Sequence, residues 1–393
     1  MSFRAALVFQ ILRCMNRPTP LRQLQVFRLP MAHPGDLSAL AALLDAGRVR
    51  ADEVVAVIGK TEGNGGVNDF TRGYFTQSLM HLLAERLGRE PAELLGELPC
   101  VLSGGTEGVL SPHYSVFVRS AAHADAPAGP ALAGPALAIG RAFSPPTPAA
   151  DIGRWAQVRA VADAVRSAMA DAGIEHPADV CFVQVKGPCV TAARAAAALA
   201  AGQRVASADP NRSMALSRAA GAFGVALALG DLPDDAALEA ALLTRFDLWC
   251  GRAGVSTGVE VQANEIVLLG HSAHWRGPLR MACEPMADAL DLPAVTRVLA
   301  RLGLNAAPQL GEADRSRVAA SLVKCEPDRR GQVRGARHTM LDDTDINAQR
   351  HVRAAVGGLV AGVLGDGQIF VSGGAEHQGP DGGGLVAVIA EVA

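Results

Sequence analysis

This 393-residue sequence is short of aromatic residues, of paired cysteines and of long apolar runs. Aromatic residues make up only 4% of the chain, the formal net charge is -3, and alanine is the commonest of the 49% of residues that are apolar. This composition excludes a strongly basic protein that binds nucleic acid, and it excludes an acidic disordered tail. No stretch reaches the ~18 uncharged apolar residues of a spanning helix, so we expect a soluble protein without membrane or nucleic-acid partners.

The cysteines also exclude two classes of small, cross-linked fold. All seven are scattered, and no two form a Cys-x-x-Cys pair. An odd number without regular spacing predicts neither a disulfide framework nor a cysteine-rich zinc site. A reducing cytoplasm is therefore the expected location.

The first 23 residues are mildly hydrophobic and basic, as a short signal sequence would be. Their apolar run is brief, however, and no small-residue cleavage site comes before Pro18. We interpret residues 1–23 as an N-terminal extension, with Met15 as an alternative start.

A segment rich in alanine, glycine and proline divides the chain. Residues 121–140 read AAHADAPAGPALAGPALAIG, and we place a linker at 126–135. Three stretches of the chain share one order of expected strand, helix and strand. They begin with QVFRLPM, ALAIGRAFS and PLRMACEPM, and their second strands are VVAVIGK, VCFVQVK and VAASLVK, which end at Lys60, Lys186 and Lys324.

Each stretch continues with an arginine near the start of an apolar helical run, then with a serine pattern and a further strand. The arginines are Arg72, Arg218 and Arg353. The pattern is Ser-(Gly/Thr)-Gly-x-Glu, and its serines are Ser103, Ser256 and Ser372. Lysine and serine are 43, 70 and 48 residues apart, as loop insertions in repeated units would produce.

The repeats are longer than the roughly 20 to 50 residues of a solenoid unit. We therefore expect an α/β fold with three homologous βα domains in one chain, related by pseudo-threefold symmetry, with the active site at the central axis. The domains are expected at residues 24–125, 136–273 and 274–393.

Three lysines and three arginines that converge on one cavity predict unusual lysine chemistry. Mutual repulsion and burial lower the pKa of a lysine. A neutral lysine can take the proton of a serine hydroxyl, which gives a Ser-Lys nucleophile pair without histidine. The remaining cations would favour an anionic substrate and stabilise charge on its carbonyl oxygens. The glycines beside the serines either let backbone N–H groups face a ligand or permit a tight turn before a strand.

Three other motifs give weaker signals. VIGKTEGNGG lacks the glycine that a phosphate loop requires five residues before its Gly-Lys-Thr. His271 and His274 could bind a metal, but their neighbours favour a loop that joins the second and third domains. Asp342, Asp343 and Asp345 could hold a hard cation, although ordering a loop and capping the next helix explains them better.

Seven longer segments resemble the cyanuric acid hydrolase and barbiturase family. They read GKTEGNGGVNDFTRGY, LSGGTEG, VQVKGP, NRSMALSRAAGAFGVALALG, ANEIVLLGHSAHW, HTMLDDTDIN and a closing SGGAEHQGPDGGG. The resemblance runs from about residue 24 onward. It implies the threefold "Toblerone" fold, with three similar domains around a central active site, and a homotetramer.

The resemblance also implies roles for individual residues. Ser256 would be the nucleophile and Lys186 its activating base. Substrate binding is implied for Lys60, Arg72, Ser103, Gly104, Arg218, Thr257, Lys324, Arg353, Ser372 and Gly373. No cofactor is implied for catalysis, but a structural Mg²⁺ or Ca²⁺ ion is. Its implied ligands are Glu326, Ala375, Gln378, Gly379, Pro380 and Gly383, a set of oxygen donors that suits a hard cation.

The implied reaction is hydrolytic ring opening of cyanuric acid to carboxybiuret, which loses carbon dioxide to give biuret. The nearest alternative is a barbiturase that opens barbiturate to ureidomalonate, since barbiturate replaces one ring N–H by a methylene. In both cases the partner is a small cyclic imide. A third alternative is a noncatalytic anion-binding protein that uses the same groups for recognition only.

Overall fold

The computed structural model describes residues 21–122 and 134–392, and its strands form three main sheets. The expected extension at 1–23 and the linker at 126–135 lie largely outside these residues. Each main sheet collects the strands of one consecutive stretch of chain. The exception is the two-residue β9 (Trp275–Arg276), which pairs with the first strand, β1, and so extends the first sheet.

The three sheets share one topology. The first contains β1 (Arg22–Pro30), β2 (Val54–Thr61), β3 (Cys100–Gly104) and β4 (His113–Ala121). The second contains β5 (Ala136–Phe143), β6 (Val180–Pro188), β7 (Ala253–Gly258) and β8 (Glu265–Ser272). The third contains β10 (Leu279–Met286), β11 (Val318–Cys325), β14 (Phe370–Gly373) and β15 (Gly384–Glu391). In each sheet the strand that carries the lysine lies between an antiparallel last strand and a parallel strand that carries the serine.

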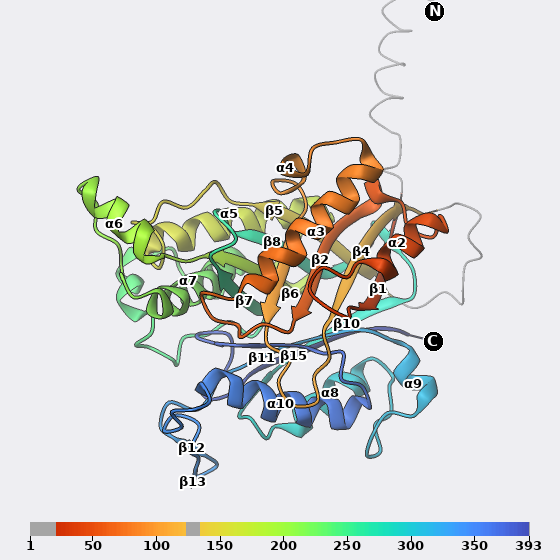
Figure 1. Ribbon diagram of the computed structural model, residues 1–393. Helices are drawn as coiled ribbons and strands as arrows, with labels where there is room; N and C mark the ends of the chain where they lie inside the picture. The colour runs from red at the N-terminus through yellow and green to blue at the C-terminus, as the bar shows by residue number, and fades with distance from the viewer. Residues whose placement is uncertain (1–20, 123–133, 393) are drawn as a thin grey trace, which may run out of the picture.

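Helices lie on the outer side of the sheets (Figure 1). The first unit has α2 (Ser38–Asp45), α3 (Phe70–Leu87) and α4 (Pro91–Leu94). The second has α5 (Trp155–Ala172), α6 (Ala192–Ala200) and α7 (Pro210–Leu229). The third has α8 (Leu292–Arg301), α9 (Glu312–Ser316), α10 (Ala348–Leu364) and the small hairpin β12 (Gln332–Val333) and β13 (Ala336–Arg337). Short 3₁₀ helices lie at Ala51–Glu53, Pro177–Asp179 and Ala236–Ala241.

The three helices that carry the arginines begin and end in the same way. Asp69, Asp209 and Asn347 precede α3, α7 and α10, and each side chain accepts a backbone N–H of the first turn. Gly88, Gly230 and Gly365 end these helices in the left-handed conformation. This shared capping supports a common origin of the three units.

The inner faces of the three sheets share one apolar core. Ile58, Leu268 and Leu385 belong to this core and come from different sheets. Further apolar clusters fill the spaces between the sheets and their helices. Strand β2 is buried along its whole length because one face meets the shared core and the other meets helices, which explains its continuous apolar run.

The fold class expected from the sequence is confirmed, since three α/β units of equal topology surround a common core.

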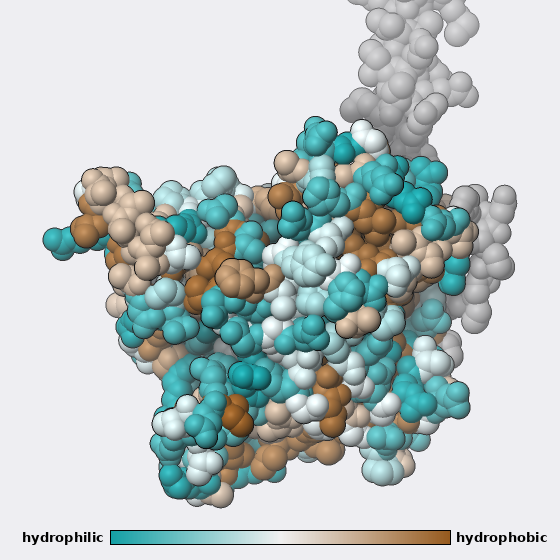
Figure 2. Space-filling view, in the orientation of Figure 1, coloured by the Kyte–Doolittle hydropathy of each residue, from teal (hydrophilic) through white to brown (hydrophobic). Residues whose placement is uncertain are grey.

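The six cysteines within the described ranges are free thiols. Among the described residues, no helix combines the length and the apolar character needed to cross a bilayer. The face in Figure 2 mixes polar and apolar colours, and α6, which projects from the body, carries the exposed Leu199.

Candidate active site

Each lysine lies directly beside its serine on two neighbouring parallel strands. The register partners are Lys60 and Ser103, Lys186 and Ser256, and Lys324 and Ser372. All three pairs stand near the carboxyl ends of their strands, so the threefold arrangement brings them to one end of the axis. Each serine is therefore part of a strand and not of a turn.

One cavity is lined by residues from all three units. Its lining consists of Gly65, Arg72, Leu102, Ser103, Gly104, Met214, Arg218, Ser256, Thr257, Arg353, Ser372 and Gly373. Apart from the lysines, every residue predicted to attack or bind the substrate is in this lining. The structure thus places the predicted residues together, and their individual roles stay predictions.

A roomier hollow lies on the surface between α2 and α3, where His81, Glu85 and Arg89 are among the lining residues. It gathers side chains from the first unit alone. Convergent groups from several elements mark a site better than size does. The central cavity is therefore the candidate active site.

The lysines of the first and third units donate hydrogen bonds to their serines. The Nζ atom of Lys60 lies 3.2 Å from the Oγ of Ser103. The Nζ atom of Lys324 lies 3.0 Å from the Oγ of Ser372. Both lysines also donate to main-chain carbonyl oxygens, so each buried amine is well coordinated.

The second unit is arranged differently. Lys186 donates to the Leu102 carbonyl oxygen at 2.9 Å and lies 2.6 Å from Oε1 of Glu260. The Oγ of Ser256 lies 3.2 Å from the Oγ of Ser372 and makes no hydrogen bond to Lys186 among the contacts of the described residues. Strand register therefore places this lysine and serine side by side, while the lysine is occupied by a carboxylate.

Burial perturbs all three amines. Lys60, Lys186 and Lys324 are at most 1% exposed. Burial and the nearby Arg353 bring the pKa of Lys60 well below its usual value. Burial, followed by Arg218, lowers the pKa of Lys324 to about 7. Burial also lowers the pKa of Lys186, although the negative charge of Glu260 opposes this effect. Each amine is thus easier to deprotonate than a solvated lysine.

These three residues are the only lysines in the sequence. The other 33 residues of the Lys and Arg total are arginines. Arginine stays protonated in proteins, whereas a buried lysine can lose its proton. Every other basic residue of the Lys and Arg total is arginine, and lysine occurs only at the three positions that lie beside a serine on the neighbouring strand. This pattern could have been recognised from the sequence.

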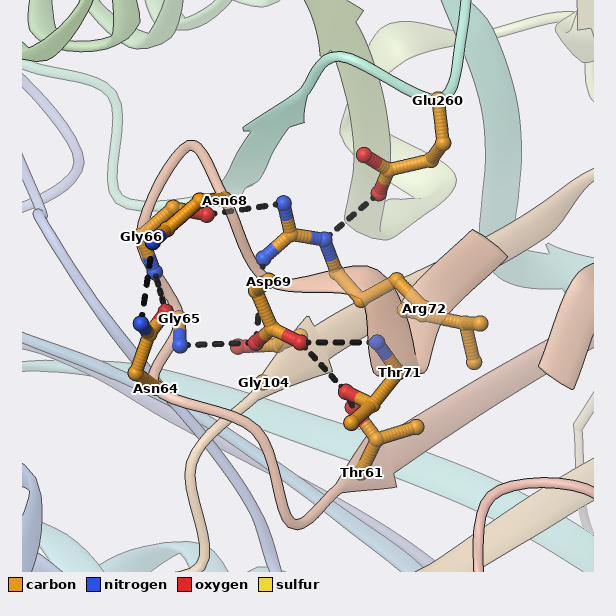
Figure 3. Close-up of polar contacts among 12 residues, drawn as sticks. Thr61, Asn64, Gly65, Gly66, Asn68, Asp69, Thr71, Arg72, Gly104 and Glu260 are labelled. Atoms are coloured by element: carbon orange, nitrogen blue, oxygen red, sulfur yellow. Dashed lines mark hydrogen bonds and ion pairs between the residues drawn. The ribbon is translucent and has the colours of Figure 1, made fainter. Parts of the chain in front are cut away.

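The glutamate that closes each serine pattern has a role that was not predicted from the sequence. Each glutamate forms an ion pair with the arginine of the preceding unit. The pairs are Arg72 with Glu260 at 2.7 Å, Arg218 with Glu376 at 2.7 Å and Arg353 with Glu107 at 2.6 Å. Three interdomain ion pairs therefore form a ring around the cavity, and Figure 3 shows the first of them.

The third position of the serine pattern is always glycine for a packing reason. A Cβ atom on Gly105, Gly258 or Gly374 would lie 2.5, 2.0 or 2.4 Å from a side-chain atom of the local glutamate or its arginine. A side chain at any of these positions would displace a member of the ion-pair ring. The glycine thus serves the arginine–glutamate contact.

The positions of the arginines differ in one detail from expectation. Arg72 and Arg353 lie in the first two turns of their helices, as predicted. Arg218 lies in the third turn, because α7 begins at Pro210. Proline is favoured at the first helical position, which explains this start.

Breaking one pair of this ring is expected to destabilise the protein. The side chains of Arg218 and Glu376 are only 11% and 8% exposed, and Glu376 has no second ion pair among the described residues, so Arg218→Ala leaves a buried carboxylate unpaired. We expect a loss of about 3 to 5 kcal/mol in the free energy of unfolding, measured by urea titration. Arg50→Ala removes the exposed pair with Asp52 and should cost about 0 to 1 kcal/mol. Equal losses for both variants would contradict the importance of the ring.

Buried oxygens near the end of β11 fit the implied cation. Oε1 of Glu326 and Oδ1 of Asp381 are buried without a hydrogen-bond partner among the described residues. Burial and the neighbouring Glu376 raise the pKa of Glu326 to about 8, even though Arg329 contacts its other oxygen. A bound cation would give the unpaired oxygens a partner and would stabilise the ionised form of Glu326. No group of three or more His, Cys, Asp or Glu side chains in the described ranges could hold a metal ion, so a cation here would rely on main-chain carbonyls.

The predicted ligands from the C-terminal segment lie in the same region. The Gly383 carbonyl oxygen accepts from the Glu326 N–H at 3.1 Å. The side chain of Gln378 is occupied, since its Oε1 accepts from the Val255 N–H at 2.6 Å. Its carbonyl oxygen is therefore the group that remains for a cation, as at Ala375, Gly379 and Pro380.

Two weaker motifs have structural roles. His271 lies in β8 rather than in a loop, and its ring nitrogens contact the Cys181 thiol and the Met281 N–H. Oδ1 of Asp343 accepts the N–H groups of Asp345 and Ile346 ahead of α10. The second arrangement orders a loop, as expected, but the expected capping by an aspartate is wrong, because Asn347 caps α10.

The chain matches known proteins over nearly its whole length. A family model described as amidohydrolase ring-opening protein matches residues 25–391. A cyanuric acid amidohydrolase of Azorhizobium caulinodans is 50% identical over 366 residues, which cover 93% of this chain and 98% of the relative. One from Enterobacter cloacae is 44% identical and covers 94% of this chain and 100% of the relative.

Two solved structures are similar to this chain. One, described as cyanuric acid hydrolase and as an evolutionary innovation by structural concatenation, has a TM-score of 0.89 at 42% identity and covers 94% of this chain and 100% of its own. The cyanuric acid hydrolase of A. caulinodans has a TM-score of 0.86 at 48% identity and covers 95% and 100%.

Proposed function

The chain belongs to the ring-opening amidohydrolase family, which makes it a hydrolase of carbon–nitrogen bonds in cyclic amides, and we propose that its substrate is cyanuric acid. The observation that carries this proposal is the symmetry of the cavity, where three serines and three arginines converge from equivalent positions. Cyanuric acid is a threefold ring of alternating carbonyl and N–H groups. Each unit can therefore hold one edge of the ring.

Ser256 is the proposed nucleophile. Its Oγ attacks one ring carbonyl, and neutral Lys186 takes the hydroxyl proton. The arginines and the backbone N–H groups beside the serines stabilise the oxyanion. The carbon–nitrogen bond then breaks, and the departing ring nitrogen takes the proton from Lys186. The product of this step is an acyl group on Ser256.

Water completes the reaction. It attacks the acyl carbon, Lys186 accepts a proton from it, and Ser256 leaves with a proton restored to its Oγ. The released carboxybiuret loses carbon dioxide without further catalysis and becomes biuret. Lys60 with Ser103, and Lys324 with Ser372, bind the other two edges of the ring in this proposal.

Turnover assays with two substrates test the proposal. Purified protein is incubated with cyanuric acid and with barbiturate, and the loss of ring absorbance is followed. Faster loss with cyanuric acid is the expected result. Faster loss with barbiturate would instead identify a barbiturase, and no loss with either would favour a noncatalytic anion-binding protein.

A structural cation is proposed at Glu326 and the carbonyl groups of Ala375, Gln378, Gly379, Pro380 and Gly383. The cation would neutralise buried carboxylates and would link the C-terminal segment to the end of β11. Because Glu376 follows Ala375 directly, this link also positions the partner of Arg218. The homotetramer and the cytoplasmic location stay predictions, which light scattering and cell fractionation would check.

Removing this cation is expected to lower the melting temperature. Saturation at 100 times the dissociation constant stabilises a protein by about 2.7 kcal/mol. Without the cation Glu326 is protonated below a pKa of about 8, so cation binding releases a proton and tightens as the pH rises toward 8. Calorimetry with and without EDTA at pH 6 and pH 9 measures this. Glu326→Gln should abolish the EDTA effect, and an unchanged effect would contradict the site.

A further inference from the structure

The ion-pair ring differs in geometry at one of its three positions. Glu107 binds Arg353 through two hydrogen bonds of 2.9 and 2.6 Å, one from Nε and one from Nη2. Glu376 binds Arg218 in the same two-point manner at 2.7 and 2.7 Å. Glu260 accepts only one hydrogen bond from its arginine, through the Nε of Arg72. Its Oε2 is buried without a hydrogen-bond partner among the described residues, and its Oε1 can take a second donor.

Asp69 explains the difference. The Nη1 of Arg72 lies 3.3 Å from Oδ2 of Asp69, and its Nη2 donates to the Gly66 carbonyl oxygen at 3.0 Å (Figure 3). The residues three positions before the other two arginines are Ala215 and Arg350, which offer no carboxylate. Arg72 is thus held by its own helix start.

The carboxylate oxygen that Arg72 binds also contacts the lysine of the second unit. Oε1 of Glu260 lies 2.6 Å from the Nζ of Lys186. The corresponding lysines donate to serines instead, with Lys60 bound to Ser103 and Lys324 to Ser372. The three units therefore differ in the contacts of one carboxylate, that of Glu260, which lies beside the second Ser-Lys pair.

We infer that Glu260 is a positioning residue that converts the second pair into a Ser256–Lys186–Glu260 triad and so distinguishes it chemically from the other two. The inference rests on the proposed function. In a Ser-His-Asp triad the carboxylate orients the base and stabilises the cation formed when the base takes the serine proton. Glu260 does the same for the Lys186 ammonium.

The charges support this role. Burial would raise the pKa of Glu260, but Lys186 and Arg72 outweigh it and hold that pKa at about 2. Glu260 is thus an anion throughout the working range, and its charge raises the pKa of Lys186 against the effect of burial. Removing the charge should therefore lower the pKa of Lys186.

Other titratable groups also face Lys186. They are Arg72 from α3, Glu265 from β8, Cys100 from β3 and Cys189 after β6. Burial raises the pKa of Glu265 to about 8, so this group can contribute to a pH profile near neutrality. A test therefore needs a signal from Lys186 itself as well as a rate.

The rate test compares Glu260→Gln with the wild-type protein across pH 5 to 10. Neutral Lys186 is the active form, so kcat rises with pH through its pKa. In Glu260→Gln this rise should move to lower pH by roughly 1 to 3 units. The plateau kcat should fall about tenfold or more, because the ammonium formed in the step loses its stabilising anion. Ionisation of the free substrate is common to both proteins and cancels in the comparison.

Glu107→Gln is the matched control, since Glu107 holds the equivalent place beside Lys60. It should leave the position of the rise unchanged, whatever it does to the rate. A purely structural role for Glu260 would lower the rate without moving the rise. An unmoved rise in Glu260→Gln, or an equal movement in Glu107→Gln, would overturn the inference.

Lysine nitrogen NMR tests the charge state without turnover. Because the chain has only three lysines, ¹⁵N-labelled lysine gives three side-chain signals, which Lys60→Ala and Lys324→Ala assign. The Lys186 signal should titrate at a lower pH in Glu260→Gln than in the wild type. An unchanged titration would overturn the inference even if the protein proved inactive on cyanuric acid, so the two failures are distinguishable.

Discussion

Ser256→Ala is expected to abolish ring opening of cyanuric acid while leaving the fold intact. Removing the nucleophile of a Ser-dependent hydrolase lowers kcat by a factor on the order of 10⁴ to 10⁶. The side chain is 5% exposed and small, and within the described part of the chain its Oγ has a hydrogen bond only to the Oγ of Ser372. The loss should therefore appear in kcat, with little change in the urea unfolding midpoint.

The serines of the other two units are the matched controls. Ser103→Ala and Ser372→Ala each remove a hydrogen bond with a lysine, which is worth about 1.5 to 3 kcal/mol where a charged group takes part. We expect losses of roughly tenfold to a hundredfold in kcat/KM, with a larger share in KM. If Ser372→Ala were inactive while Ser256→Ala retained an appreciable kcat, the nucleophile would be Ser372.

Repetition made much of this molecule predictable from its sequence. The strands that end in lysine and the strands that follow the serine pattern form as expected, because apolar runs bounded by polar residues reflect burial on both faces. Spacing alone could not show that Lys60 and Ser103 are register partners. That relation depends on parallel pairing between segments 43 residues apart.

The difference between the three units could not be predicted in the same way. Glu260 occupies the same position in its pattern as Glu107 and Glu376, so local sequence gives it no distinct partner. Its contact with Lys186 follows from Asp69, which lies in another unit and acts through Arg72. Such a dependence spans nearly 200 residues of sequence and is visible only when the units are assembled. The contact that distinguishes the second Ser-Lys pair from the other two therefore depends on tertiary structure.

Lys186→Arg is expected to be as inactive as Lys186→Ala. Arginine keeps the positive charge beside Glu260 but cannot release its proton, so it cannot accept one from Ser256. General base catalysis contributes about 10² to 10⁴ to a rate, and both variants should lose at least that factor in kcat. Steady-state kinetics on cyanuric acid measure the loss. Appreciable activity in Lys186→Arg would show that only charge is needed at this position.

Small primary amines provide the accompanying control. Lys186→Ala leaves a space next to Glu260 that an amine such as methylamine can fill, and its free base can then take the proton of Ser256. The rate of Lys186→Ala should rise with the concentration of the free amine, while Lys186→Arg, whose side chain fills that space, should not respond. Lys60→Ala should also fail to respond, because its missing amine binds substrate instead of accepting a proton. Equal rescue of Lys60→Ala and Lys186→Ala would contradict the assignment of the base.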